Sequence, residues 1–382
     1  MYSNIKVAVA GTGFIGPVHV EGLRRLGVQV KGILGSSLEK SLKAAKHLGL
    51  DMGYAAYEDI LEDREISAIH IAAPNVTHYE MVTQALKAGK HVMCEKPLAM
   101  TSKQTEELVQ LARSSGLVAA VTYNVRFYPM NLEAQIRVKD GDIGRIFSIS
   151  GSYVQDWLLY EDDYNWRVSA KKGGALRAVA DIGTHWMDLI YSITGLEVEA
   201  VFANLNTVHK QRKKPLGEIE TFSSKTQEVA TEDIDIDTED CGSILFRYTN
   251  GAQGTLWVSQ VTAGFKNRIR YEIAGSKKSL SWDSDRANQL HIGHREHSNE
   301  ILEKDPALVA VPTASFIDYP GGHSEGFPDT FKQCFRAFYN AILNRENISG
   351  RLSFASFEDG HKEVRLCEAI LESHHTERWI HL

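Results

Sequence analysis

Two groups of ionisable residues have the types and the spacing that proton chemistry needs. The first is Glu95-Lys96-Pro97, where an apolar run ends abruptly in a charged pair and a proline. The second is Asp181, His185 and Asp188, whose spacings of four and three residues place them on one face of a helix. A lysine can stabilise developing negative charge, and a histidine titrates near neutral pH. These groups are the candidate reactive centres.

The Asp/His group has other interpretations. It could be the solvated start of a helix, and the spacing alone does not decide between that and a cluster that looks into a cleft. The pattern DxxxHxxD is not a standard zinc pattern, and no further histidine or cysteine reinforces it. We therefore expect no metal.

A nucleotide-binding pattern lies near the N-terminus. The apolar run at residues 5–10 is followed at once by Gly11-Thr12-Gly13-Phe14-Ile15-Gly16 and by a helix-like segment. In such a unit the first glycine permits a tight turn, the second lets a pyrophosphate approach, and the third lets helix and strand pack closely. The N-terminus of the helix offers free N–H groups to phosphate. The predicted cofactor contacts here are Gly11, Gly13, Phe14, Ile15 and Gly16.

The residues at the end of the second predicted strand do not decide between NAD and NADP as the coenzyme. An acidic residue there usually selects NAD and a basic one NADP, but the sequence has Gly35-Ser36-Ser37, with Lys40 a few residues on. Ser36, Ser37 and Lys40 are candidate contacts to a ribose hydroxyl or a 2′-phosphate, or Ser37 merely caps the next helix. Because no arginine is present, NAD is slightly favoured over NADP.

Further candidates follow the next strand, at the edge where a doubly wound sheet holds its ligand. They are Ala73, Pro74, Asn75 and His78. Asn75 could equally cap the following helix, and His78 could be structural.

The pattern of predicted secondary structure changes after the first third of the chain. Strands and helices alternate through residue 122, which is typical of a parallel sheet; later alternating runs with short turns indicate an antiparallel sheet. We predict an α/β Rossmann domain with a doubly wound, mostly parallel sheet at residues 1–125. Residues 126–382 are predicted to form an α+β domain with a large, mostly antiparallel open sheet, whose last helices could pack back on the first domain.

Two long connections are expected in the second domain. Residues 207–232 read as a polar, mobile insertion between strands, and the charge runs at residues 210–214 and 232–240 are typical of a solvated loop. Residues 296–329 form another irregular connection. His323 and Glu325, in the latter, are candidate substrate contacts or part of a glycine-rich lead-in to the next helix.

Composition excludes several classes of protein. A formal net charge of -7 over 382 residues lacks the basic footprint of a nucleic-acid binder. No segment approaches the roughly 20 apolar residues that span a bilayer, and no signal-peptide layout is present. We expect a cytoplasmic protein without nucleic-acid or membrane partners.

The sequence resembles the glucose-fructose oxidoreductase / inositol dehydrogenase / MocA (Gfo/Idh/MocA) family of NAD(P)-dependent dehydrogenases over nearly its whole length. The motifs that carry the resemblance are the glycine turn at residues 11–16, the edge at residues 73–78, Glu95-Lys96-Pro97, and Asp181-Ile182-Gly183-Thr184-His185. None of these motifs is specific for the family alone, but their combination in a chain that begins with a Rossmann pattern is specific.

The resemblance implies that Lys96, Asp181 and His185 form the catalytic site of a dehydrogenase. It implies oxidation of a secondary hydroxyl of a sugar, sugar derivative or polyol, and a homodimer or homotetramer that pairs through the C-terminal sheet. Further expected cofactor contacts are Glu95, Lys96, Asn124, Trp166 and Arg167. The expected substrate contacts are Lys96, Arg126, Tyr153, Asp181, His185 and His323.

Three alternatives stay open. They are an NADPH-dependent reductase, a cycling enzyme that keeps its cofactor tightly bound, and a non-catalytic sensor that binds NAD(P)(H).

Overall fold

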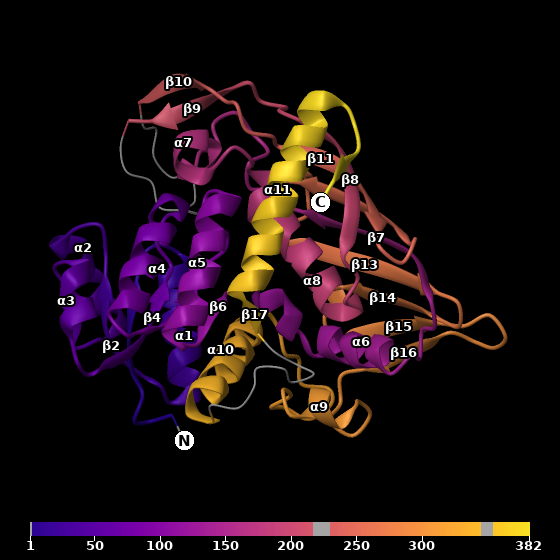
Figure 1. Ribbon diagram of the computed structural model, residues 1–382, viewed down its shortest axis with the longest axis horizontal. Coiled ribbons are helices and arrows are strands. Elements are labelled where there is room, and N and C mark those ends of the chain that lie inside the picture. The colour runs from indigo at the N-terminus through magenta and orange to yellow at the C-terminus, as the bar shows by residue number, and fades with distance from the viewer. Residues whose placement is uncertain (1, 217–229, 345–353) are drawn as a thin grey trace. The chain divides into compact units, whose positions relative to one another are not determined.

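The computed structural model describes residues 2–216, 230–344 and 354–382, which form two compact units (Figure 1). The first unit comprises Met1–Phe127 and Phe327–Val364, and the second comprises Tyr128–Gly326 and Arg365–Leu382. Helix α10 (Phe327–Asn344) and the first part of α11 (Phe357–Thr376) thus belong to the first unit.

The first unit is built on a doubly wound sheet. Its described strands follow the order β17-β6-β5-β4-β1-β2-β3, and β1 to β6 are parallel while β17 is antiparallel to β6. They are β1 (Lys6–Ala10), β2 (Gln29–Leu34), β3 (Met52–Tyr54), β4 (Ile66–Ile71), β5 (His91–Cys94), β6 (Ala119–Val121) and β17 (Ala355–Ser356). The predicted parallel sheet is confirmed. Ligands bind such sheets beyond the carboxyl ends of the strands where the order reverses, here between β1 and β4.

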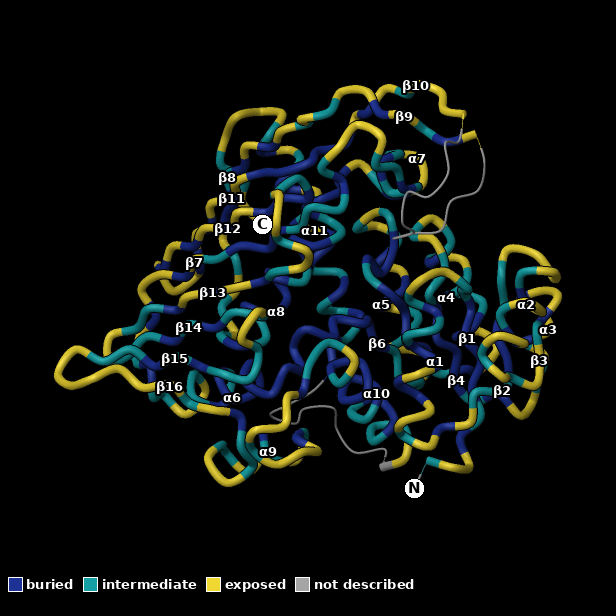
Figure 2. The backbone as a smooth tube through the Cα atoms, turned by 180° about the vertical axis from the view of Figure 1, so that it is seen from behind, coloured by how far each residue is buried: buried dark blue, intermediate teal, exposed yellow. Residues whose placement is uncertain are grey.

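Helices pack on both faces of this sheet. They are α1 (Ile15–Leu26), α2 (Leu38–Leu48), α3 (Tyr57–Glu62), α4 (His78–Lys87), α5 (Ser102–Ser115) and α10. In the buried strand β4 (Figure 2), Ile69 and Ile71 pack with residues of α4 and α5, whereas His70 contacts α1 and α10. Because successive side chains of a strand point to opposite faces, the two helix pairs cover opposite sides of the sheet.

The second unit is built on a larger sheet. Its described strands run β16-β15-β14-β13-β7-β12-β11-β8-β18, and all neighbours are antiparallel except β7 and β12. They are β7 (Ile146–Val154), β8 (Val198–Asn206), β11 (Cys241–Tyr248), β12 (Gln253–Ser259), β13 (Arg268–Gly275), β14 (Ser279–Asp283), β15 (Gln289–Gly293), β16 (Glu300–Glu303) and β18 (Ile380–His381). The predicted mostly antiparallel open sheet is confirmed.

Two helices cover one face of the second sheet, α6 (Pro129–Lys139) and α8 (Thr184–Thr194) (Figure 1). Trp186 of α8 is fully buried, stacks on Phe246 with ring centroids 6.0 Å apart, and donates its indole N–H to the carbonyl of Arg270. Burial alternates along β11, so the outer face of the sheet is exposed. This alternation fixes which side chains face α8.

The expectation of a polar, mobile insertion at residues 207–232 and of a solvated loop at the charge runs was wrong for the described residues, which contain a pair of strands. Strand β9 (Gln211–Pro215) pairs with β10 (Thr231–Asp235) as a separate two-stranded sheet. The fully buried Arg212 side chain anchors it by donating to the carbonyls of Leu158 and Tyr160 and to Asp240. Residues 217–229 lie outside the described ranges.

The connection at residues 296–329 is also more ordered than expected, since it contains β16 and helix α9 (Val311–Ala314). Across residues 2–216, 230–344 and 354–382, no helix combines the length and apolar character needed to cross a bilayer.

A buried ion pair holds the end of that connection. Lys304, whose side chain is 1% exposed, donates to the carbonyls of Tyr319 (2.9 Å) and His323 (2.8 Å) and to Glu325 (2.9 Å). Glu325 is fully buried in its side chain and also accepts the N–H of Asp318. These contacts favour the structural alternative for Glu325 over a substrate contact.

Replacing Lys304 with methionine should therefore lower the free energy of unfolding by about 3–5 kcal/mol, because Glu325 would remain as an uncompensated buried charge. The measurement is urea unfolding of the full chain, with Lys277→Met as an exposed lysine control. The double variant Lys304→Met/Glu325→Gln should be more stable than the sum of the single changes. Simple additivity would show that the pair does not act as a unit.

Candidate functional site

The glycine turn after β1 fits a bound pyrophosphate. A Cβ atom added to Gly11 (φ +134°) would lie 2.2 Å from the carbonyl oxygen of Ala72, and one added to Gly16 would lie 2.0 Å from that of Gly11. A Cβ at Gly13 would meet nothing within 4 Å. Helix α1 starts after Phe14 with no side-chain cap and no acidic residue in its first turn. An open glycine beside such a helix start favours an anionic ligand.

The serines after β2 do not share one environment. The Ser37 hydroxyl accepts the N–H of Lys40 at 3.3 Å and caps α2, which confirms the capping alternative. Ser36 is exposed and Lys40 is partly buried. Their contact with a ribose stays a prediction.

His78 joins two loops at the carboxyl edge of the first sheet. It is fully buried; its Nδ1 lies 2.7 Å from the carbonyl oxygen of Pro97, and its Nε2 lies 2.9 Å from that of Ala73. Burial lowers the pKa of His78, although the two carbonyls oppose this shift. Asn75 begins a short 3-10 turn, Asn75–Thr77, and is not the cap of α4. The structure thus gives His78 a role in holding the loop that contains Lys96.

The loop after β5 presents Lys96. The backbone N–H of Glu95 donates to the carbonyl of Ile71 at 2.8 Å, and one carboxylate oxygen of Glu95 accepts the N–H of Lys96 at 3.3 Å. The Lys96-Pro97 peptide bond is cis. The Lys96 side chain is partly buried. Glu95 thereby fixes the backbone from which the lysine projects.

Asn124 and Arg126 have partners inside the first unit. They lie in the 3-10 turn Asn124–Phe127, and both are buried. Asn124 donates to the hydroxyl of Thr330 at 2.7 Å, and Arg126 lies 3.2 Å from Asp359. Their contact with cofactor or substrate stays a prediction.

Asp181 lies in a π-helical turn of the second unit. This turn, Val179–Gly183, leads directly into α8, so the helical segment begins before Asp181 and is irregular there. One carboxylate oxygen of Asp181 accepts the amide N–H of Gln260 at 2.8 Å, and the other lies 3.4 Å from Nε of Arg167. Such turns are frequent at functional sites.

His185, in the first turn of α8, lies beside Tyr153 of β7. The centroids of their rings are 6.3 Å apart, and the Tyr153 hydroxyl donates to Asn267 at 2.8 Å. Burial, followed by the neighbouring Tyr128 and Asp181, raises the pKa of Tyr153, so its phenol stays protonated. Asp188 is 1% exposed, which contradicts a solvated helix start.

The Trp166-Arg167 segment, predicted to contact the cofactor, lies beside Asp181 in the second unit. It forms a 3-10 turn, Trp166–Val168, followed by the short helix α7 (Ala170–Gly173). The Arg167 guanidinium lies 4.5 Å from the centroid of the Trp166 ring and contacts Asp181. The structure therefore gathers Tyr153, Arg167, Asp181 and His185 within this unit.

A buried network of hydrogen bonds and ion pairs, which the sequence did not predict, connects to Asp181 through Gln260. Arg177 is fully buried in its side chain and forms an ion pair with Asp240, which also accepts from Arg212 at 2.7 Å. Arg177 donates to Gln260 at 3.4 Å, and Gln260 in turn donates to Asp181. The sequence holds no local signal for these partners, because they are far apart along the chain.

Glu239 accepts hydrogen bonds at the start of the π-helical turn that carries Asp181. Its carboxylate accepts the backbone N–H groups of Arg177 (2.9 Å) and Val179 (2.8 Å). Burial raises the pKa of Glu239 to about 6, although these hydrogen bonds act against the shift. Glu239 and Asp240 close the acidic run that was expected to be solvated; their burial overturns that interpretation for both.

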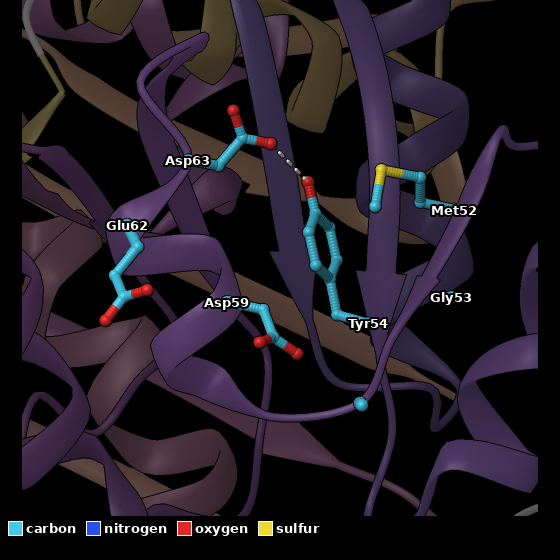
Figure 3. Close-up of a pocket in the computed structure, with 7 residues that line it drawn as sticks. Met52, Gly53, Tyr54, Asp59, Glu62 and Asp63 are labelled. Atoms are coloured by element: carbon cyan, nitrogen blue, oxygen red, sulfur yellow. Dashed lines mark hydrogen bonds between the residues drawn. The ribbon is translucent and has the colours of Figure 1, made fainter.

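The pocket drawn in Figure 3 lies away from the glycine turn and from Lys96. It is lined by residues of β3 and α3, where Tyr54 donates to Asp63 at 3.3 Å. Because β3 is the edge strand while the glycine turn and Lys96 follow the inner strands β1 and β5, this pocket is not the candidate site. Its Asp63 also pairs with Lys31 at 2.6 Å.

Two predicted or possible ligand groups lie elsewhere in the second unit. His323 is exposed and its Nδ1 contacts the carbonyl of Gly321 at 3.2 Å, so its substrate role stays a prediction. Among the residues placed by the structure, His294, His297 and Glu300 have ligand atoms within 4.8 Å of one another. This group joins β15 to β16, and the absence of a metal site stays an expectation.

Comparison with known proteins covers both units. A family model described as an oxidoreductase family, NAD-binding Rossmann fold, matches residues 5–123. A model described as the GFO/IDH/MocA C-terminal domain matches residues 131–281. Levoglucosan dehydrogenase of Pseudarthrobacter phenanthrenivorans is 27% identical over 399 aligned residues, which cover 99% of this chain and 98% of that protein. Myo-inositol 2-dehydrogenase of Thermotoga maritima is 26% identical, covering 74% and 76%.

Solved structures show the same likeness. Levoglucosan dehydrogenase in complex with NADH and L-sorbose superposes with a TM-score of 0.89 at 27% identity, covering 99% of both chains. Its complex with NADH and levoglucosan gives 0.88 at 26% identity, again covering 99% of both chains. The chain is thus similar, over nearly its whole length, to a dehydrogenase solved with NADH.

Exchanging two glycines separates cofactor binding from folding. Gly13→Val should leave the free energy of unfolding nearly unchanged and weaken NAD binding at least about tenfold, because its side chain would fill the space a pyrophosphate needs. Gly16→Ala should destabilise the fold, since its Cβ would collide with the backbone of Gly11. The measurements are NAD titration by fluorescence and urea unfolding. Wild-type NAD affinity in a folded Gly13→Val variant would contradict the assigned site.

Stability should fall in mild acid. Burial lowers the pKa of both His70 and His78, whereas histidines of the unfolded chain take up protons as pH falls through about 6.5. The unfolded state then binds more protons, so the free energy of unfolding decreases from about pH 7 to about pH 5. Urea titrations at both pH values measure this. The variant His70→Gln should reduce the change in the free energy of unfolding between the two pH values, and the exposed control His47→Gln should not. An unchanged pH dependence in His70→Gln would refute the lowered pKa of His70.

Proposed function

Because this chain belongs to the GFO/IDH/MocA family of NAD-binding oxidoreductases, we propose that it oxidises a secondary hydroxyl of a sugar, sugar derivative or polyol to a ketone. The observation that carries this proposal is its full-length similarity to levoglucosan dehydrogenase. The chain also contains the lysine, aspartate and histidine that the reaction needs. Levoglucosan and myo-inositol are therefore the first substrates to test.

The proposed chemistry assigns one role to each of three residues. Bound NAD would supply the hydride acceptor, at C4 of its nicotinamide ring. The hydroxyl proton must pass to a base within about 3 Å, and we assign this role to His185. Asp181 orients the base or holds a substrate hydroxyl, and Lys96 stabilises the developing alkoxide.

Contacts within each unit support these roles. Lys96 projects from a loop held by Glu95 and His78. Asp181 is held by Gln260 and lies beside Arg167. Fixed acceptors and cations of this kind reduce the reorganisation that the reaction would otherwise need.

We propose NAD as the coenzyme. No acidic or arginine side chain follows β2 directly, and the Ser37 hydroxyl is already used to cap α2. The preference for NAD then rests on the family description and on the lack of an arginine for a 2′-phosphate.

The proposal includes a homodimer or homotetramer that pairs through the second sheet. On its outer face Leu245 and Trp257 are 40% and 43% exposed, and Leu245 is opposite Phe202 in the register of β8 and β11. Large apolar side chains grouped on one exposed face are typical of an interaction surface.

The test is reduction of NAD, followed at the absorbance band of the reduced nicotinamide while sugars and polyols are supplied. At least one should be oxidised. Lys96→Ala and His185→Ala should each lower kcat about 100-fold or more with NAD affinity retained, and exposed Lys103→Ala should not. Near-normal turnover in either variant would exclude its assigned role, and cofactor binding without reduction across a broad panel would favour the sensor.

A further inference from the structure

Four buried side chains form a continuous line that ends at the carboxylate next to Lys96. The Glu95 Oε1 atom lies 3.0 Å from Nε2 of His19. His19 Nδ1 lies 2.9 Å from Nδ1 of His70, and His70 Nε2 lies 2.7 Å from the hydroxyl of Tyr339. The line therefore joins the loop after β5 to α1, β4 and α10, all within the first unit.

Apolar and aromatic groups surround this line. His19, His70 and Tyr339 have no exposed surface, and Glu95 is 8% exposed. Phe335 packs on both imidazoles, with ring centroids 4.8 Å from His19 and 4.7 Å from His70. Polar atoms in such surroundings must be satisfied by one another.

The surroundings fix the charge of the two groups farthest from Glu95, His70 and Tyr339. Burial, together with the neighbouring His19, holds the pKa of His70 well below its usual range, so this imidazole is neutral. Burial raises the pKa of Tyr339, so its hydroxyl stays protonated. Among the described residues, Cys94 and His78 also interact electrostatically with Glu95, and the charge of Lys96 acts on His78.

The direction of the hydrogen bonds follows from the end groups. In one order of the line, His19 donates from Nε2 to the carboxylate oxygen of Glu95. His19 then accepts at Nδ1 from the Nδ1–H of His70. His70 accepts at Nε2 from the Tyr339 hydroxyl. Every donor in this order has an acceptor.

The reverse order fails at its far end. If His19 carried protons on both nitrogens, His70 would donate to the Tyr339 oxygen instead of accepting. The Tyr339 hydroxyl hydrogen would then need a different acceptor, and within the described residues His70 is the hydrogen-bond partner of that hydroxyl. A buried donor left without an acceptor costs about 1–3 kcal/mol, so the first order is favoured.

We propose that Tyr339, His70 and His19 form a directed line of hydrogen-bond donors that stabilises the ionised form of Glu95 and holds its carboxylate in place next to Lys96, which makes His19 a positioning residue for the reaction. The inference rests on the proposed role of Lys96. Neutral donors stabilise the carboxylate without adding a second positive charge that would compete with the lysine. Because His19 lies on α1, the helix that begins at the glycine turn, the line also couples that turn to the Lys96 loop.

Nuclear magnetic resonance tests the line without any turnover. Long-range nitrogen–proton spectra of the nitrogen-labelled full chain at neutral pH should show His19 protonated on Nε2 alone and His70 on Nδ1 alone. A doubly protonated His19, or a proton on Nε2 of His70, would overturn the proposal. This readout holds even if no sugar or polyol is oxidised, in which case the proposed function fails and the line is still tested.

Kinetics tests the consequence for Lys96. His19→Leu should lower kcat about tenfold or more and move the acid limb of the kcat/KM profile to higher pH, because Glu95 loses a donor. KM for NAD should change less than about threefold. His19→Gln, whose amide can still donate, should recover most of kcat. His91→Leu, at the other end of β5, should match the wild type.

A folded His19→Leu variant with wild-type kcat and pH profile would overturn the proposal. So would a His19→Gln variant as impaired as His19→Leu, since a merely structural role predicts no rescue by a donor.

Discussion

The carboxylate of Glu95 is the contact on which the candidate chemistry of the first unit depends. It accepts the backbone N–H of Lys96 with one oxygen and contacts His19 with the other. The backbone N–H of Glu95 donates to the carbonyl of Ile71 at the end of β4. The loop that presents the lysine is thus tied to β4 and, through His19, to α1, the helix that begins at the glycine turn, so the turn and the lysine lie at the same edge of the sheet.

The second unit uses the same principle with different residues. Asp181 does not stand alone on a helix face; Gln260 holds it, and Gln260 is bonded to an Arg177–Asp240 pair in the core. Satisfied buried networks of this kind fix a side chain in one orientation. The irregular π-helical turn that carries Asp181 persists because Glu239 accepts the backbone N–H groups at its start.

The sequence predicted the features that are encoded locally. The glycine turn, the two kinds of sheet and the positions of Lys96, Asp181 and His185 at element ends follow from residue type and short-range spacing. It did not predict what depends on pairs far apart in the chain. His19 and His70 are 51 residues apart, and Arg177 and Asp240 are 63 apart, so a histidine in an apolar strand and an aspartate in an acidic run looked unremarkable. The sequence did not predict the β9–β10 pair, because its buried anchor, Arg212, lies in a basic run whose composition is typical of a solvated loop.

The most direct test of the account follows a labelled hydrogen. Levoglucosan or myo-inositol with deuterium on the carbon to be oxidised would be incubated with the full chain and NAD, and the reduced cofactor analysed by mass spectrometry and NMR. The account predicts that the deuterium appears at C4 of the nicotinamide ring in the wild type and that transfer almost ceases in Lys96→Ala. Reduced cofactor without deuterium, or transfer that is unaffected in Lys96→Ala, would contradict it.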